Sequence, residues 1–255
     1  NIFMESENIS LMDYADSIKI VLVGTTHPGN IGAAARAIKT MGLKHLDLVS
    51  PKEFPSDEAV YRSKAAKDIL DEASIYQSLL ESVKDCEIVI GTSARNRKIP
   101  WPVLDPKGAS KEINSKVRKN SKAAIVFGRE DRGLTNEELG LCNLHVHIPT
   151  NEEYTSLNLA QAVQIMTYEI RMSFIDLDNK EHDQEWDVDL ATSDQTERLI
   201  DHMDELMKEV EFYDTENPRK LLMRVRRFFK RSDIDVMEAN IFRGLFSTIQ
   251  KKLNK

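Results

Sequence analysis

The sequence predicts an α/β domain in which helices cover both faces of a parallel sheet, with a small all-α extension at the C-terminus. Strand-length runs that are mostly apolar alternate with longer helical patterns, as in a sheet buried on both faces. The chain has 255 residues, 41% of them apolar and 30% charged, which is ordinary for a globular protein with a full core. The last quarter of the chain contains helical patterns alone.

Five short runs are expected to form the sheet. Each is rich in Val, Ile, Leu or Ala on neighbouring positions and is bounded by turn residues. The five runs are residues 18–24, 45–50, 86–91, 123–128 and 144–148. Because helical patterns separate them, we expect the strands to pair in parallel through crossover helices.

The helices between these strands are predicted from Ala-rich or amphipathic patterns and from their end signals. Gly42 is a typical residue just beyond a helix end. Thr135 precedes Glu138 by three positions, as in a capping box at a helix start. The expected helical segments are 29–41, 57–83 in one or two pieces, 106–119, a short helix from Thr135, and 157–175.

The chain is expected to have four regions. They are an N-terminal tail (1–17), the α/β domain (18–175), an acidic linker (176–192) and a helical C-terminal domain (193–255). The linker is assigned because residues 176–189 are almost wholly acidic or polar, so they offer little apolar surface to bury.

Three helices are predicted after the linker, at 193–213, 218–230 and 236–253. Ser193 or Asp194 could cap the first helix, since short polar side chains satisfy free backbone N–H groups. Pro218 suits the first turn of the second helix. Asp233 or Asp235 could cap the third. A region of this size buries too little apolar surface to be expected to fold independently, so it is expected to dock on another surface.

The net charge of −7 argues weakly against nucleic-acid binding, because surfaces that track phosphates are usually basic. The distribution matters more than the sum. Residues 219–231 are strongly basic, and without residues 176–189 the rest of the chain is close to neutral. Charge alone therefore excludes no RNA-binding function.

Cys86 and Cys142 are far apart and lie in or beside apolar runs, which predicts buried free thiols of a reduced, cytoplasmic protein. Their spacing does not fit a zinc site, and no metal is expected. No apolar run is long enough to cross a bilayer, and no signal peptide is recognisable, so no membrane association is expected.

Three loops follow the carboxyl ends of predicted strands, where α/β proteins usually bind ligands. They are residues 25–32, 128–134 and 149–158. The third opens a helix with no charged residue in its first turn, so free backbone N–H groups face the loop. Together they predict a binding crevice.

Other motif assignments fit less well. Gly24, Gly29 and Gly32 have the wrong spacing for a dinucleotide fingerprint, and no Lys-Ser/Thr follows to form a P-loop. Ser156 is not in a nucleophile elbow. His27 is more readily explained as a turn residue than as a catalyst.

Two questions stay open on the residues alone. Asn30 and Arg36 could converge at one helix mouth, or Arg36 could be a solvated surface charge beside a tight turn. Glu130 and the next residue, Asp131, could be paired acid/base carboxylates or a metal site, but the adjacent Arg129 and Arg132 favour ion-paired groups.

Taken together, the three loops resemble the three motifs of the SPOUT superfamily of RNA methyltransferases, in the branch that methylates ribose 2′-hydroxyls. The matching residues are Asn30 with Arg36, Gly128-x-Glu130-x-x-Gly133-Leu134, and Ser156-Leu157-Asn158-Leu159-Ala160. Further segments resemble the TrmJ family, which methylates the ribose of tRNA nucleotide 32; they are Thr92–Arg95 followed by Pro100-Trp101-Pro102, residues 224–229 and residues 237–244. The similarity extends from Ile18 to Leu253, apart from the acidic linker.

The resemblance implies a deep trefoil knot in the α/β domain, S-adenosylmethionine bound by the knotted loops, and a homodimer with each active site near the subunit interface. The implied cofactor-binding residues are Thr92, Ser93, Ala94, Gly128, Ile148, Thr155, Ser156 and Leu157. The implied catalytic residues are Arg36, Asn30, Glu130, Ser156 and Asn158.

Methyl transfer to a ribose oxygen needs in-line approach and loss of the hydroxyl proton, and neither requires a metal. The family is thought to use the Arg36 position to activate the hydroxyl, which fits poorly with the very high pKa of a guanidinium. We therefore expect Arg36 to grip the adjacent RNA phosphate and to polarise the hydroxyl. Asn30 and Asn158 would orient the ribose or Arg36. Glu130 could equally be structural, by fixing an arginine.

The partner implied by the resemblance is tRNA. The candidate RNA-binding residues are Arg95, Arg97, Lys98, Arg224, Arg226 and Arg227. Two functions compete with tRNA methylation within the same resemblance, namely 2′-O-methylation of another RNA such as rRNA, and RNA binding without catalysis. A Rossmann-like enzyme with a different nucleotide cofactor is disfavoured by the absent fingerprint.

Overall fold

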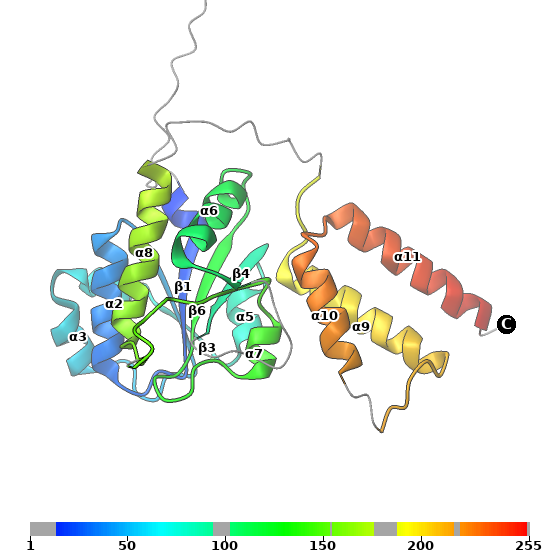
Figure 1. Ribbon diagram of the computed structural model, residues 1–255, viewed down its shortest axis with the longest axis horizontal. Coiled ribbons are helices and arrows are strands. Elements are labelled where there is room, and N and C mark those ends of the chain that lie inside the picture. The colour runs from blue at the N-terminus through cyan, green and yellow to red at the C-terminus, as the bar shows by residue number, and fades with distance from the viewer. Residues whose placement is uncertain (1–13, 94–102, 154, 176–187, 217–219, 254–255) are drawn as a thin grey trace, which may run out of the picture.

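A seven-stranded, fully parallel sheet organises the first part of the chain in the computed structural model, which describes residues 14–93, 103–153, 155–175, 188–216 and 220–253 (Figure 1). The strand order is β3-β2-β1-β6-β4-β7-β5. The strands are β1 (Ile18–Val23), β2 (His45–Val49), β3 (Ser74–Tyr76), β4 (Ile88–Thr92), β5 (Val103–Leu104), β6 (Ala123–Phe127) and β7 (Leu144–Val146). The α/β class and the five predicted strands are confirmed.

Two strands and one helical region differ from the prediction. The edge strands β3 and β5 are too short for a periodic pattern, and pairing to β2 and β7 defines them. Residues 57–83 form more pieces than predicted, because β3 lies between the helical segments. These segments are α3 (Asp57–Ser63), a 3₁₀ turn η2 (Lys64–Ala66), α4 (Lys67–Asp71) and α5 (Leu79–Val83).

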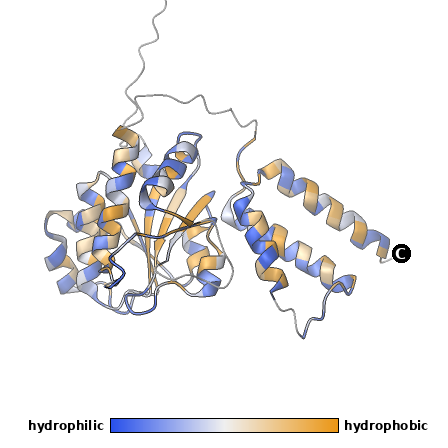
Figure 2. Ribbon diagram, in the orientation of Figure 1, coloured by the Kyte–Doolittle hydropathy of each residue, from blue (hydrophilic) through white to orange (hydrophobic). Residues whose placement is uncertain are grey.

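Both faces of the sheet are buried, which explains why its strands are apolar at consecutive positions. Along β1, Ile18, Ile20 and Leu22 enter one core and Val21 and Val23 enter the other. The first core lies under α2 (Pro28–Thr40), α6 (Pro106–Val117) and α8 (Leu159–Ile175), and the second under α5 and α7 (Asn136–Gly140). Figure 2 shows these apolar strands between helices of mixed polarity.

The C-terminal helices are α9 (Ser193–Glu209), α10 (Leu221–Arg231) and α11 (Val236–Leu253), as predicted to within a few residues, and they share a separate core. The cap of α9 is Thr192, one residue earlier than predicted, in a capping box with Gln195. Asp235 caps α11 by accepting from the backbone N–H of Glu238. Pro218 lies outside the described residues.

A buried cation joins α10 to α9 at the place where the C-terminal helices contact the α/β domain. Lys230 of α10 is 1% exposed, and its Nζ donates to Ser193 Oγ at 2.8 Å and lies 3.2 Å from Glu197 Oε1. Across the junction, Asn143 Nδ2 donates to the Lys230 carbonyl at 3.0 Å, and the Ser193 N–H donates to the Cys86 carbonyl at 2.9 Å. The expectation that this region docks on another surface is confirmed.

Both cysteines are buried free thiols, as predicted. Among the described helices, none combines the length and apolar character needed to cross a membrane.

Two helical glycines provide a matched test of packing. A methyl group on Gly32 of α2 would overlap the carbonyl oxygen of Ala59 in α3, whereas a methyl group on Gly244 of α11 would meet nothing within 4 Å. Gly32→Ala should therefore lower the free energy of unfolding by about 1–3 kcal/mol through overpacking. Gly244→Ala should raise it by up to about 1 kcal/mol, since alanine favours helix. Urea denaturation of both variants checks this, and equal effects would contradict the close α2–α3 contact.

Candidate active site

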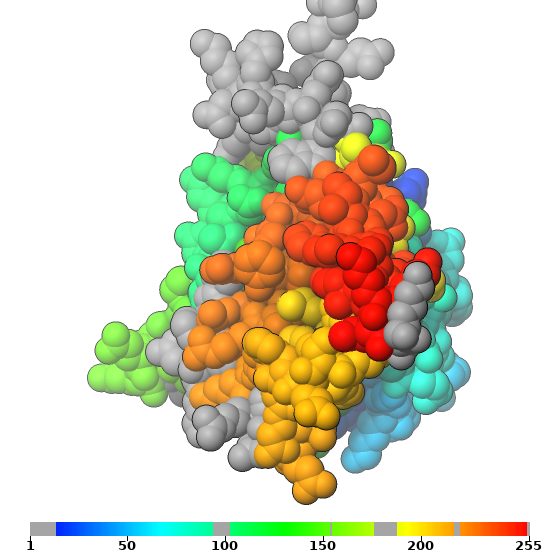
Figure 3. Space-filling model, turned by 90° about the vertical axis from the view of Figure 1, so that its right-hand side faces the viewer, coloured from blue at the N-terminus to red at the C-terminus, as the bar shows by residue number. Residues whose placement is uncertain are grey.

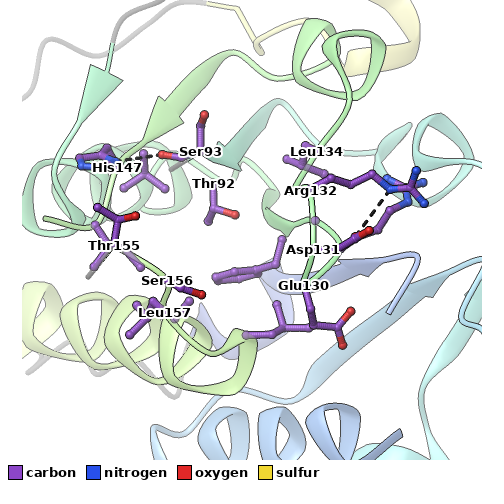
Figure 4. A pocket seen from close by; sticks show the side chains of 18 of the residues that line it. Thr92, Ser93, Glu130, Asp131, Arg132, Leu134, His147, Thr155, Ser156 and Leu157 are labelled. Carbon is purple, nitrogen blue, oxygen red and sulfur yellow. Dashed lines mark hydrogen bonds and ion pairs between the residues drawn. The ribbon is translucent and has the colours of Figure 1, made fainter. Parts of the chain in front are cut away.

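A cavity of about 270 Å³ opens at the carboxyl ends of β4, β6 and β7 (Figure 4). This is the edge of a parallel sheet where ligands usually bind. Thr92 and Ser93 end β4 on one side, residues 128–134 form the opposite wall, and the loop before α8 closes the third side. Seven predicted cofactor-binding residues line it: Thr92, Ser93, Gly128, Ile148, Thr155, Ser156 and Leu157. The eighth, Ala94, lies outside the described residues.

The wall after β6 is a tight loop that requires glycine. A side chain on Gly128 would overlap the backbone of Gly133 and Leu134, so the two ends of the loop approach closely only without one. Gly133 has φ +70°, in the left-handed region that favours glycine. The Arg129 N–H donates to the Gly133 carbonyl at 3.3 Å, and the reverse bond is 2.8 Å. The loop therefore presents backbone groups to the cavity in a fixed shape.

An ion pair anchors this loop from behind. The Arg129 guanidinium donates through both terminal nitrogens to the two carboxylate oxygens of Glu138, each at 3.0 Å. Glu138 also completes the predicted capping box by accepting from the Thr135 N–H at 2.7 Å. A two-point ion pair of this kind fixes orientation as well as distance. The 128–134 loop is thus tied to the start of α7.

Glu130 closes the start of α2. One carboxylate oxygen accepts from the Thr26 N–H at 3.0 Å and from the Thr26 hydroxyl at 2.9 Å. The other accepts from the His27 N–H at 3.3 Å and from Asn30 Nδ2 at 3.0 Å. A carboxylate at a helix N-terminus satisfies free N–H groups and interacts favourably with the helix dipole. These partners, rather than an arginine, are what the described residues give Glu130.

The pKa of Glu130 reflects these contacts. Partial burial alone would raise the pKa of the carboxyl, but the hydrogen bonds from Asn30 and from Thr26 outweigh it and hold the pKa below its ordinary value. Glu130 is therefore ionised at neutral pH, and its oxygens are already occupied by donors.

Asn30 and Asn158 extend this contact to the third loop. Asn158 Nδ2 donates to Asn30 Oδ1 at 3.1 Å. Asn158 Oδ1 in turn accepts from the backbone N–H groups of Ala160 at 2.9 Å and Gln161 at 3.4 Å, so the residue caps α8. A chain of hydrogen bonds from Asn158 through Asn30 to Glu130 thus joins the three segments, which the sequence predicted to lie together but without these bonds.

Arg36 is not in this group. It is exposed on α2 and does not line the cavity. Six residues of α-helix carry it about 9 Å along the axis from Asn30 and to a position about 120° around the helix. The described part of the chain gives its guanidinium neither a hydrogen bond nor an ion pair. Within one chain, the structure does not bring Arg36 to the cavity.

Ser156, by contrast, is at the cavity. Its exposed hydroxyl makes no hydrogen bond to any described residue. A hydroxyl that is both donor and acceptor at the mouth of a cavity is suited to contact a ligand.

The predicted RNA-binding residues divide into two sets. Arg95, Arg97 and Lys98 lie outside the described residues. On α10, Arg226 turns inward and donates to Glu197 Oε2 at 2.9 and 3.1 Å, so its charge is already paired. Arg224 is exposed and Arg227 is half-buried.

Several residues of the site were not foreseen. His147 lines the cavity, and its Nδ1 lies 3.0 Å from the Ser93 carbonyl. Asp131 and Arg132 are an exception, because the sequence favoured ion pairing there, and they form an exposed pair at 3.6 Å on the cavity wall. Thr26 supplies two of the donors to Glu130. None of these residues follows a spacing rule, so only their neighbourhood to a loop could have suggested them. In the described ranges, no cluster of His, Cys, Asp and Glu could hold a metal ion.

Two family models together match most of the chain. Residues 17–168 match the SpoU rRNA Methylase family, and residues 194–255 match the C-terminal domain of the tRNA methyltransferase TrmJ.

Curated relatives and solved structures agree with these matches. The tRNA (cytidine/uridine/adenosine-2′-O-)-methyltransferase TrmJ of Pseudomonas aeruginosa is 46% identical over 92% of this chain and 95% of its own length. The corresponding cytidine/uridine enzyme of Photorhabdus laumondii is 41% identical over 94% and 99%. The crystal structure of TrmJ from Zymomonas mobilis superposes with a TM-score of 0.79 at 29% identity and covers 91% of this chain and 98% of that one.

The depressed pKa of Glu130 predicts a pH-dependent contribution to stability. A carboxyl whose pKa is lower folded than unfolded stabilises the fold above the unfolded value of about 4.3, and this stabilisation is lost as the pH falls through the folded pKa. Glu130→Gln keeps the size and shape of the side chain but places an NH₂ group, itself a donor, against the donors that contact the Glu130 carboxylate. Urea unfolding should show a deficit for this variant at pH 7 that narrows towards pH 3. Glu72→Gln, at an exposed glutamate whose side chain has no partner among the described residues, is the control. A pH-independent deficit at Glu130 would contradict the assignment.

Proposed function

This chain belongs to the SpoU methylase family, in its TrmJ group of tRNA 2′-O-methyltransferases, and on that premise we propose that it methylates the ribose of nucleotide 32 in the anticodon loop of tRNA with S-adenosylmethionine as donor. It would act in the cytoplasm, on cytidine or uridine. The matches cover both the α/β domain and the C-terminal helices, so they support a role for both regions in the same enzyme.

The observation that carries the proposal is that hydrogen bonds join residues of all three motifs beside one cavity. Glu130 and Asn158 lie in two separate loops and Asn30 lies in the first turn of α2, and direct hydrogen bonds join their side chains. A cavity lined by small, hydroxyl-bearing and apolar residues lies beside them. This is the arrangement expected where a cofactor and a second substrate must be held in fixed relation.

The cavity suits S-adenosylmethionine. Its walls combine apolar Phe127, Val146 and Leu159, which can cover an adenine ring, with backbone groups of the glycine loop and the hydroxyls of Thr92 and Ser156. The closed shape of this loop depends on Gly128 lacking a side chain, because a Cβ there would overlap the backbone of Gly133 and Leu134. When bound, this cofactor supplies an electrophilic methyl group on a positively charged sulfur.

The residues of this chain would then position the ribose and stabilise the negative charge that develops on its 2′-oxygen. Ser156, whose hydroxyl at the cavity mouth has no partner among the described residues, would contact the cofactor or the ribose. Asn158 would fix the mouth while its side chain caps α8. Glu130 has its oxygens filled by four donors, so we assign it to holding the α2 start rather than to taking the 2′-hydroxyl proton.

Arg36 would contact the RNA phosphate next to the target and polarise the 2′-hydroxyl, in a site completed by a second subunit. Arg36 is exposed and has no partner among the described residues, so its charge is available to a phosphate. Because Arg36 does not line the cavity of its own chain, a second subunit or the bound RNA would have to place it beside the target ribose. Exposed apolar side chains on α8, Tyr168 at 47% and Ile175 at 54%, are of the kind that a homodimer interface covers.

The direct test is transfer of tritiated methyl to tRNA. Undermethylated bulk tRNA should accept methyl from S-adenosylmethionine, and an anticodon stem-loop with 2′-deoxycytidine at nucleotide 32 should not, because the acceptor oxygen is missing. Ribosomal RNA as the preferred acceptor, or binding without transfer, would overturn the proposal. Isothermal titration with S-adenosylmethionine, NAD and ATP identifies the cofactor independently.

The role of Arg36 predicts a graded loss. Arg36→Ala should lower kcat on the order of 100-fold or more, and Arg36→Lys should retain part of the activity because the charge remains without the planar fork. Arg198→Ala removes another exposed arginine, on α9, and serves as the control. Near-normal turnover in both Arg36 variants would remove this residue from catalysis.

Substitutions of the exposed Arg224 and of the ion-paired Arg226 should affect different properties of the protein. Arg224→Gln should weaken tRNA binding and reduce the slope of log K against log salt by about 0.7–0.9, as expected for one lost phosphate contact. Arg226→Gln should lower stability by about 1–3 kcal/mol instead, since it removes charged hydrogen bonds to the buried Glu197. Filter binding at several salt concentrations and urea unfolding separate the two, and a reversed pattern would contradict the assignment.

A further inference from the structure

An exposed aromatic ring on α10 is anchored in a way that the cofactor cavity does not explain. Phe228 is 50% exposed, whereas the next residue, Phe229, is 4% exposed. The two rings meet edge to face, with centroids 5.3 Å apart and an interplanar angle of 76°. Such pairs stabilise beyond the area that they bury, so the outer ring is held by the inner one.

The anchoring continues through the helical core. Phe229 contacts Phe242 of α11 at 5.7 Å, Phe242 contacts Phe246 at 6.2 Å, and Phe246 contacts His202 of α9 at 5.5 Å. Phe228 is the solvent-exposed end of this row. Its backbone is also fixed, because the Ser232 hydroxyl donates to its carbonyl at 2.6 Å. A ring held in this way loses little conformational freedom when a flat partner stacks on it.

Cations flank the ring on the same side of the helix. Arg224 precedes Phe228 by four positions and Arg231 follows it by three, and both spacings place side chains on one helix face. Both arginines are exposed, and in the described part of the chain neither guanidinium has a hydrogen bond or an ion pair. Figure 3 shows α10 and α11 next to each other on an open face of the molecule.

We propose that Phe228, between Arg224 and Arg231, is a stacking platform for an unpaired RNA base, and this inference rests on the proposed tRNA substrate. A rigid aromatic face between cations that can reach the flanking phosphates is the combination that single-stranded nucleotides bind. The surface is distinct from the cofactor cavity, so it holds RNA without touching the reacting atoms.

The competing occupant is another protein surface. Met237, Ile241 and Leu245 form an exposed apolar row on α11, which a second copy of the chain could cover. The unpaired arginines beside Phe228 favour RNA, because a second copy would bring the same positive charges together. The platform is thus assigned to RNA, and self-association is an outcome that the test must detect.

The test compares Phe228→Leu with Phe212→Leu, since Phe212 is similarly exposed, at 65%, but contacts no other aromatic ring among the described residues. Equilibrium binding is measured to an anticodon stem-loop and to a fully paired RNA duplex of equal charge. Phe228→Leu should weaken stem-loop binding on the order of 5- to 100-fold, as for one lost base stack. Duplex affinity and the salt slope should be unchanged, because the ring is neutral. Phe212→Leu should match the wild type.

Other results overturn the platform. Equal loss on stem-loop and duplex would indicate a general structural defect, which thermal unfolding and Phe228→Trp check, since tryptophan should restore binding to the loop. An altered sedimentation coefficient with unchanged RNA affinity would assign the surface to a second copy. If the wild type methylates tRNA and Phe228→Leu binds it normally, the platform alone is wrong. If the wild type neither binds nor methylates tRNA, the proposed function fails with it.

Discussion

The hydrogen-bond chain from Asn158 through Asn30 to Glu130 is the interaction on which the site depends. Each member does two things at once. Glu130 closes the start of α2, and Asn158 caps α8, while Asn30 accepts from one and donates to the other. Because the polar groups at two helix starts are satisfied by the same three side chains, neither helix can shift without leaving backbone N–H groups unpaired. The cavity shape follows from this.

The C-terminal helices are connected to the same structure through α7. On one side of α7, Glu138 holds Arg129, the residue next to Glu130. On the other side, the Arg226 side chain lies against Gly140 at the end of α7. Asn143, which follows α7, donates to the Lys230 carbonyl. The junction around Lys230 and the 128–134 loop therefore share one short helix, α7. We expect a change in the docking of α10 to shift α7 and, through it, the wall of the cavity.

Much of this could be predicted from the sequence, for identifiable reasons. The five main strands carry mostly apolar runs, because both of their faces are buried, and such runs are recognisable from the local sequence alone. The three loops were placed correctly at one sheet edge, since parallel strands align their carboxyl ends. The edge strands β3 and β5 were missed because two or three residues hold no periodicity. The partners of Glu130 were missed because Thr26 and Asn30 lie about a hundred residues away, beyond any spacing rule.

Arg36 shows the limit of spacing arguments. The spacing left open whether Arg36 converges with Asn30, and only the family resemblance implied a catalytic role; within one chain Arg36 does not line the cavity. Asn30, Glu130 and Asn158 hold helix starts and Ser156 lies at the cavity, whereas the Arg36 guanidinium has no partner in the described part of the chain. This contrast is why we look to a second subunit or the RNA to complete the site around Arg36. A guanidinium is already protonated at neutral pH and cannot take the proton of the 2′-hydroxyl. It can still lower the barrier to methyl transfer by stabilising the negative charge that develops on the 2′-oxygen. The group that receives the proton is then sought on the RNA or on a second subunit, rather than on Glu130, whose carboxylate oxygens are already filled.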